Sequence, residues 1–191
     1  MKLGQTYHER LVEVIQLNAN CINVGIERMS NEIFEASERG NNVWVIGNGG
    51  SASTAEHFET DLAYVRHDSL RFYPSVSALT ANSSLTTAIS NDISYEDLFG
   101  VILNRKGKSG DFLITISASG NSLNILNAIA QAKTQGITTF SLLGFDGGQA
   151  SKISDDSLVV LTQSGEYGIV EDIHLSICHA VSKKLLRMLV R

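Results

Sequence analysis

The stretch Val43-Trp44-Val45-Ile46-Gly47-Asn48-Gly49-Gly50-Ser51 decides the fold, because an apolar β-type run passes there into a glycine-rich turn and then a helical pattern. The same order recurs where Phe112-Leu113-Ile114-Thr115-Ile116 leads into Ser117-Ala118-Ser119-Gly120-Asn121-Ser122. We therefore expect both turns at the carboxyl ends of parallel strands, where open α/β sheets bind their ligands. Glycines let the backbone approach a ligand, and serine hydroxyls and the N–H groups of a helix start attract an anion. The two turns together predict a phosphate-binding α/β domain.

Each turn alone also fits an ordinary strand-to-helix connection, in which serine caps the helix and glycine permits a tight bend. Neither turn is a nucleotide signature, since the first lacks the spaced G-x-G-x-x-G pattern and the second lacks the lysine of a P-loop. The presence of both turns in one small domain favours the ligand-binding interpretation.

The remaining chain alternates between predicted strands and helices, which indicates βαβ units and a mostly parallel sheet of about five strands with helices on both faces. The predicted strands lie near residues 43–47, 75–79, 112–116, 138–143 and 158–162, and the predicted helices near 53–64, 85–89, 123–135 and 170–190.

The first forty residues form a predicted helical region that ends at Gly40-Asn41-Asn42. Because this region precedes the first strand, its apolar face must pack on the domain or on another subunit, and both alternatives stay open. The apolar side chains at helical spacing include Leu11, Val14, Ile15, Ile22, Ile26 and Met29.

Composition narrows the class of protein. The chain has 191 residues, of which 43% are hydrophobic and 18% charged, and this fits a single domain spanning residues 1–191. A net charge of −5, with no basic cluster before residues 183–187, argues against nucleic-acid or membrane-surface binding. The two cysteines, Cys21 and Cys178, exclude a paired-cysteine metal site. With no signal peptide or bilayer-spanning apolar run, we expect a cytoplasmic protein.

A polar constellation lies on two predicted helices. His57 and Asp61 are four residues apart, so they project from one face as metal ligands or an acid/base pair would. On the terminal helix Glu171 and His174 share a face, and His179 lies two turns beyond Glu171 with a moderate angular offset. These residues need not face one site, because helical histidines are often structural and first-turn carboxylates often complement the helix dipole.

Together with Asn91-Asp92, Asp146-Gly147-Gly148 and Ile173-His174, these motifs resemble the sugar isomerase (SIS) domain family, of the phosphoheptose isomerase type. The resemblance covers nearly the whole chain. It implies a flavodoxin-like three-layer α/β/α sandwich and a homotetramer with active sites between subunits. The implied reaction converts sedoheptulose 7-phosphate into D-glycero-D-manno-heptose 7-phosphate, in heptose biosynthesis for lipopolysaccharide or capsule.

The resemblance also implies roles for individual residues. His57 matches a zinc ligand of family members that bind zinc, and His179 matches an acid/base histidine that can also meet the metal. Ser117, Ser119 and Ser122 would hold the sugar phosphate. The full set of implied substrate contacts is Asn48, Gly49, Gly50, Ser51, Asn91, Asp92, Ser117, Ala118, Ser119, Ser122 and Glu171.

Two positions depart from the family pattern. Asp61 stands where these isomerases carry a Glu that serves as base and metal ligand, and Glu171 stands where they carry a Gln. Asp is shorter by about 1.5 Å, and misplacement on that scale would cost about a hundredfold in rate if nothing compensates. Glu171 would compensate as a longer-reaching base or a second anionic metal ligand, so either carboxylate could remove the proton. The set His57, Asp61, Glu171 and His179 suits zinc or another divalent ion.

Two other functions stay open at this point. The family includes a non-enzymatic relative that binds the bacterial replication initiator, and a sugar-phosphate sensor could use the same turns. The histidines and carboxylates at positions 57, 61, 171 and 179 favour an enzyme over a pure scaffold. We therefore expect an enzyme that binds a phosphorylated sugar, zinc and further copies of itself.

Overall fold

The computed structural model describes residues 4–64 and 70–190. In this part of the chain, five parallel strands form one sheet in the order β2-β1-β3-β4-β5. This is the strand order of flavodoxin-like folds, so the expected topology is confirmed. The strands are β1 (Asn42–Gly47), β2 (Ser75–Ala78), β3 (Phe112–Ser117), β4 (Thr138–Leu143) and β5 (Asp156–Val159).

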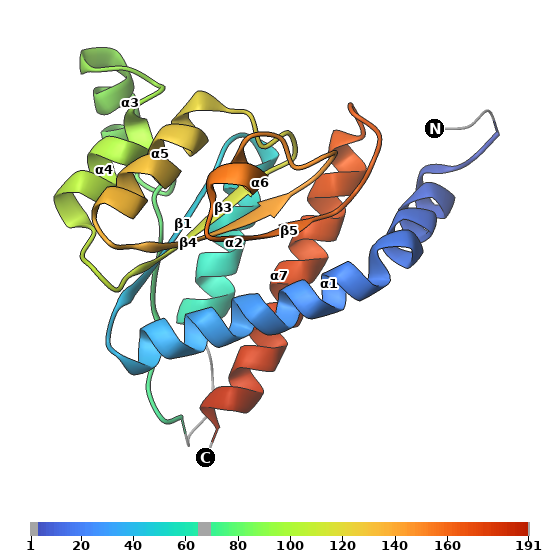
Figure 1. Cartoon of the computed structure of the whole chain (residues 1–191), viewed down its shortest axis with the longest axis horizontal. Coiled ribbons are helices and arrows are strands. Elements are labelled where there is room, and N and C mark those ends of the chain that lie inside the picture. Colours follow the sequence, from blue (N-terminus) through green and yellow to red (C-terminus); the bar gives the residue numbers. More distant parts are fainter. Residues whose placement is uncertain (1–3, 65–69, 191) are drawn as a thin grey trace.

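Helices cover both faces of the sheet, which confirms the three-layer sandwich (Figure 1). On one face, apolar side chains of α1 (Tyr7–Glu38), α2 (Gly50–Ala63) and α7 (Tyr167–Leu189) build a core with the strands. The opposite core is built by α3 (Ser83–Asp92), α4 (Leu98–Lys106), α5 (Leu123–Thr134) and the single turn α6 (Ala150–Ile153).

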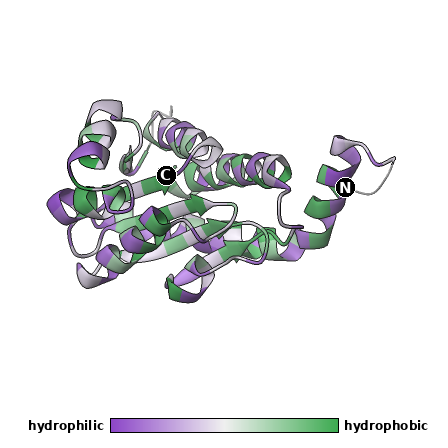
Figure 2. Cartoon of the chain, turned by 90° about the horizontal axis from the view of Figure 1, so that it is seen from above, coloured by the Kyte–Doolittle hydropathy of each residue, from purple (hydrophilic) through white to green (hydrophobic). Residues whose placement is uncertain are grey.

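The strands are apolar on both sides because both of their faces are buried. In β1, Val43 and Val45 belong to the core with α1, α2 and α7, whereas Trp44 and Ile46 belong to the opposite core. Seen from above, hydrophobic residues gather along the strands and hydrophilic residues recur on the surrounding helices (Figure 2). The pairing of Gly47 with Ile116 places the ends of β1 and β3 side by side, so the two predicted turns begin as neighbours.

The expected amino-terminal helical region is one helix of 32 residues, α1, which begins with a capping box at Thr6. One face packs on the sheet through fully buried side chains such as Met29 and Ile33. Leu17 and Val24 on other faces are 73% and 45% exposed, so a contact with another subunit stays a prediction. Within residues 4–64 and 70–190, neither α1 nor any other helix combines the length and apolarity needed to cross a membrane.

The structure differs from the sequence-based expectations at two element boundaries and in two additional short helices. Helix α2 begins at Gly50 rather than near Ser53, so the glycine-rich turn runs directly into the helix. Strand β5 begins at Asp156, two residues earlier than expected, and ends at Val159. The helices α4 and α6 were not expected, because nine and four residues are too few for a periodic pattern to stand out.

Candidate active site

The two predicted turns line a single pocket at the carboxyl end of the sheet. Its cavity measures about 130 Å³ and joins the first turn, the second turn and the start of α7. Neither α2 nor α5 has a side-chain hydrogen bond at its N-cap, although the Ser51 and Ile125 N–H groups donate to the carbonyls of Asn48 and Ser122. The lining residues are Asn48, Ser51, Ile116, Ser117, Ala118, Ser119, Ser122, Tyr167 and Glu171.

The serine-rich turn is held in shape by a hydrogen bond within it and by close packing on the Asp146-Gly147-Gly148 turn. Ser117 Oγ accepts a hydrogen bond of 3.1 Å from the Gly120 N–H. Gly120 has a positive φ of 62°, and a Cβ there would overlap the carbonyl oxygen of Gly147. The Asp146-Gly147-Gly148 motif therefore packs directly against the serine-rich turn. Gly120 permits this approach because it has no Cβ.

A pair of asparagines joins the glycine-rich turn to the start of α5. The side-chain amides of Asn48 and Asn124 donate to each other's oxygens, both at 2.9 Å. The Tyr95 hydroxyl also donates to Asn48 Oδ1, at 2.8 Å. Sequence reasoning missed Asn124 and Tyr95, and no local spacing could have revealed them, since they meet Asn48 only through the fold.

The Glu171 carboxylate lies against the start of α2. A Cβ added to Gly50 would overlap both carboxylate oxygens, so a glycine is needed there for Glu171 to occupy this place. Within the described chain, Glu171 makes no hydrogen bond or ion pair. The pocket thus contains a partly buried carboxylate that accepts from no donor among the described residues.

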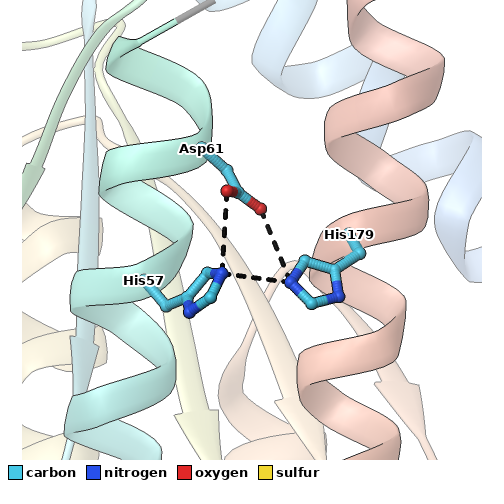
Figure 3. Close-up of side chains that lie close together, drawn as sticks. All are labelled: His57, Asp61 and His179. Carbon is cyan, nitrogen blue, oxygen red and sulfur yellow. Dashed lines mark hydrogen bonds and ion pairs between the residues drawn. The ribbon is translucent and has the colours of Figure 1, made fainter.

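His57, Asp61 and His179 form a second cluster, further along the same two helices (Figure 3). The two histidine Nε2 atoms are 3.1 Å apart. Asp61 Oδ1 lies 3.7 Å from His57 Nε2, and Asp61 Oδ2 lies 3.8 Å from His179 Nε2. The three side chains point toward one another across the gap between α2 and α7.

The cluster fits a divalent metal ion. Tetrahedral zinc with ligand bonds of about 2.0–2.2 Å separates its ligand atoms by roughly 3.3–3.6 Å. The observed 3.1, 3.7 and 3.8 Å are close to that spacing. Two imidazole nitrogens and one carboxylate oxygen suit zinc and similar ions, and three ligands leave a coordination position open.

Comparison with known proteins identifies the family. The SIS domain model matches residues 6–144 of the chain. The chain belongs to the SIS domain family. A phosphoheptose isomerase from Sulfurimonas denitrificans is 40% identical over 88% of this chain and 85% of its own length. The structure of a phosphoheptose isomerase from Francisella tularensis has a TM-score of 0.84 and 25% identity over 95% of both chains. Phosphoheptose isomerase GmhA from Neisseria gonorrhoeae, at 23% identity and a TM-score of 0.85 over 94% of both chains, shows the same fold.

This SIS domain does not bring all predicted site residues together. Glu171 is not part of the group formed by His57, Asp61 and His179. It precedes His179 by eight residues on α7, which is about 12 Å along the helix axis. Asn91 and Asp92 are exposed at the end of α3, where the Asn91 amide donates to Asp92, and they do not line the pocket. Gly49 and Gly50 are exposed beside the pocket and do not line it either.

His174 belongs to the core of this SIS domain rather than to the site. Its side chain is fully buried, and its ring lies beside the backbone of Leu143. Burial lowers the pKa of His174 from 6.5 to about 4, because the charged imidazolium loses its hydration. His174 is therefore a neutral core histidine, although it shares a helix face with Glu171.

Proposed function

We propose that this protein is a phosphoheptose isomerase that converts sedoheptulose 7-phosphate into D-glycero-D-manno-heptose 7-phosphate. The observation that carries the proposal is one pocket in which a serine-rich turn faces Glu171, a carboxylate with no partner in the described part of the chain. Its relatives support the reaction, since the Sulfurimonas protein is named a phosphoheptose isomerase.

The serine-rich turn would anchor the sugar phosphate. Ser117, Ser119 and Ser122 bring three hydroxyls to the pocket, and the start of α5 adds the positive end of a helix. The Ser122 side chain makes no capping bond to α5, which leaves its hydroxyl for a ligand. Binding energy gained at the phosphate would then position the distant reacting end of the sugar.

Glu171 is our candidate for the base. An aldose–ketose isomerase removes a proton from the carbon next to a carbonyl, passes through an enediol and returns the proton to the adjacent carbon. Glu171 lines the same pocket as the phosphate turn, whereas Asp61 faces two imidazoles at 3.7 and 3.8 Å. The two carboxylates would therefore have different roles: Glu171 would transfer the proton, and Asp61 would bind the metal.

His57, Asp61 and His179 would hold the divalent ion. When bound there, the ion would polarise the sugar carbonyl and stabilise the negative charge that develops on its oxygen. Helices α2 and α7 lead from the pocket, at Ser51 and Glu171, toward this cluster. A seven-carbon sugar phosphate would lie along that path. His179 would pass protons to and from the sugar oxygens when its nitrogen is not bound to metal.

Our proposal includes the assembly. Residues 1–191 would form one SIS domain, and four copies would associate with active sites between subunits. The exposed apolar side chains of α1, such as Leu17 and Val24, support a helical contact between copies. Asn91 and Asp92, exposed outside their own pocket, would contact substrate in such an assembly.

The proposal is tested by following sedoheptulose 7-phosphate by NMR with the purified protein, after chelation and again after adding zinc. We expect turnover to disappear with the metal and to return with zinc. Folded protein with no turnover in either state would contradict the isomerase and support a sugar-phosphate sensor or a scaffold that binds the replication initiator. Inorganic phosphate binding by the chelated protein separates these two, because only the sensor needs the anion.

A further inference from the structure

We infer that Arg10 and Tyr7, at the amino-terminal end of α1, are positioning residues that hold the start of α7 and with it the Glu171 carboxylate. The inference rests on the proposed role of Glu171. It gives α1 a part in the active site in addition to packing on the sheet, and Figure 1 shows α1 running across α7.

Arg10 binds the residue at which α7 begins. Its Nε and Nη2 donate to the two oxygens of Glu166, at 2.8 and 2.9 Å, and its Nη1 donates to Glu13 at 2.9 Å. The side chains of Arg10 and Glu166 are each only 11% exposed. Two-pronged, charge-assisted pairs of this kind are strong and fix orientation. Glu166 is the N-cap residue of α7 and also accepts from the Gln163 N–H at 3.0 Å, so this pair ties the helix start to α1.

Tyr7 reaches the residue next to Glu171. Its hydroxyl donates to Asp172 Oδ2 at 2.7 Å. Gly168 leaves space for it, since a Cβ there would lie 3.2 Å from the hydroxyl oxygen. Burial and the charge of Asp172 raise the pKa of Tyr7 to about 12, so the hydroxyl keeps its proton and remains a donor.

A third contact holds the strand-to-helix loop from the same helix. Asn18 is 4% exposed, and its amide oxygen accepts from the Leu161 N–H at 2.9 Å while its amide donates to the Leu161 carbonyl at 3.1 Å. Tyr7, Arg10 and Asn18 of α1 thus hold residues 161–172 through side-chain hydrogen bonds. This segment carries Tyr167 and Glu171, which form one wall of the pocket.

The consequence concerns geometry at the reacting end of the substrate. The phosphate turn is held by the hydrogen bond between Gly120 and Ser117 and by its packing on Gly147. The Glu171 carboxylate has no hydrogen-bond or ion-pair partner in residues 4–64 and 70–190, so the backbone of α7 sets its position. Loosening the start of α7 would therefore misplace the base while leaving phosphate binding intact.

The experiment compares full-length Arg10→Met and Arg10→Lys with Arg28→Met in the isomerase assay. Arg28 is a matched control, because it lies on the same helix and pairs with Asp156 at 3.1 Å and the Ser157 carbonyl at 2.9 Å, away from α7. We expect Arg10→Met to lower kcat by about tenfold or more with little change in KM, and Arg10→Lys to recover part of the loss. Equal kcat for Arg10→Met and Arg28→Met would overturn the inference.

Two further measurements separate positioning from general destabilisation. In a Glu171→Gln background, Arg10→Met should lower kcat no further, because both changes act through one carboxylate; an additive loss contradicts this. Without substrate, amide hydrogen exchange of residues 163–172 should be faster in Arg10→Met than in Arg28→Met. Unchanged exchange contradicts the inference even if the wild-type protein has no isomerase activity, which would contradict only the proposed function.

If Arg10→Met does not fold, Tyr7→Phe supplies the same test. It keeps the ring against α7 and removes only the hydrogen bond to Asp172. We expect a smaller fall in kcat with KM maintained, and faster exchange around residue 172. A Tyr7→Phe protein that matches wild type in both measurements would remove Tyr7 from the set of positioning residues.

Discussion

Two carboxylates stand at opposite ends of the parallel sheet and differ in what surrounds them. Asp111, just before β3, is 1% exposed and accepts from the Trp44 indole at 2.9 Å and from the backbone N–H groups of Asn42 and Lys108 at 2.9 and 3.0 Å. Glu171, at the carboxyl end, accepts from no donor in the described chain.

The difference separates a structural carboxylate from a candidate catalytic one. A buried carboxylate whose oxygens are all used stabilises the strands that supply its donors, but it has nothing left for a ligand. A partly buried carboxylate without donors in a pocket can exchange a proton with a substrate. Partner count, more than burial, therefore distinguishes the two roles in this molecule.

Replacing Glu171 with Gln should produce the largest effect and tests the catalytic side of the comparison. The amide keeps the shape but cannot accept a proton, so we expect kcat to fall by about 10²- to 10⁴-fold. Zinc content and the thermal midpoint should stay at wild-type values. Steady-state kinetics with metal analysis measures this, and Asp61→Asn is the matched control that should lose zinc. If Asp61→Asn is inactive with zinc bound while Glu171→Gln turns over, the base is Asp61.

Replacing Asp111 with Ala tests the structural side. The change leaves the Trp44 indole and two backbone N–H groups without their acceptor, so the free energy of unfolding should fall by about 3 kcal/mol. The remaining folded protein should keep its kcat, because Asp111 lies at the end of the sheet away from the pocket. Urea denaturation followed by fluorescence gives the stability change. A variant as stable as wild type would show that partner count does not identify the structural carboxylate.

His174 extends the comparison, because it is as buried as Asp111 and its burial outweighs a backbone hydrogen bond at Leu143. Its pKa falls from 6.5 to about 4 on folding, so the unfolded state binds the proton more readily between these values. Its contribution to stability is complete above pH 6.5 and is lost as pH falls, by about 2 kcal/mol at pH 5. Urea unfolding of chelated wild type and His174→Leu at pH 7 and 5 measures this. Parallel losses in both proteins would contradict a neutral core histidine.

Replacing Ser119 with Ala should have the smallest effect. Loss of one hydroxyl from the phosphate turn should weaken substrate binding by about 1 kcal/mol, seen as a rise in KM of about fivefold. His179→Ala should instead lower kcat, since His179 belongs to the cluster at the reacting end. Kinetics of both variants under zinc saturation checks this division. An equal loss of kcat in both, with KM unchanged, would place Ser119 outside the phosphate site.

Much of the fold was predictable because its signals are local. Strands β1 and β3 and the two turns follow from short apolar runs that end in glycine or serine, and the other strands follow from their alternation with helical patterns. The strand order followed from the resemblance. The His57–Asp61 pair followed from a spacing of four on one helix. The short helix α4 was not predicted, because nine residues carry too little periodic signal.

The chain's own pattern therefore settled the sheet, the turns at its carboxyl end and the residue types at the site, since each depends on neighbours a few positions away. Packing settled which side chains meet. His179 joins His57 across 122 residues, Glu171 rests on Gly50 instead of entering that cluster, and His174 turns into the core. Arg10 reaches Glu166 across 156 residues. Spacing along the chain cannot predict these long-range contacts, because they depend on how whole helices pack on the two faces of the sheet.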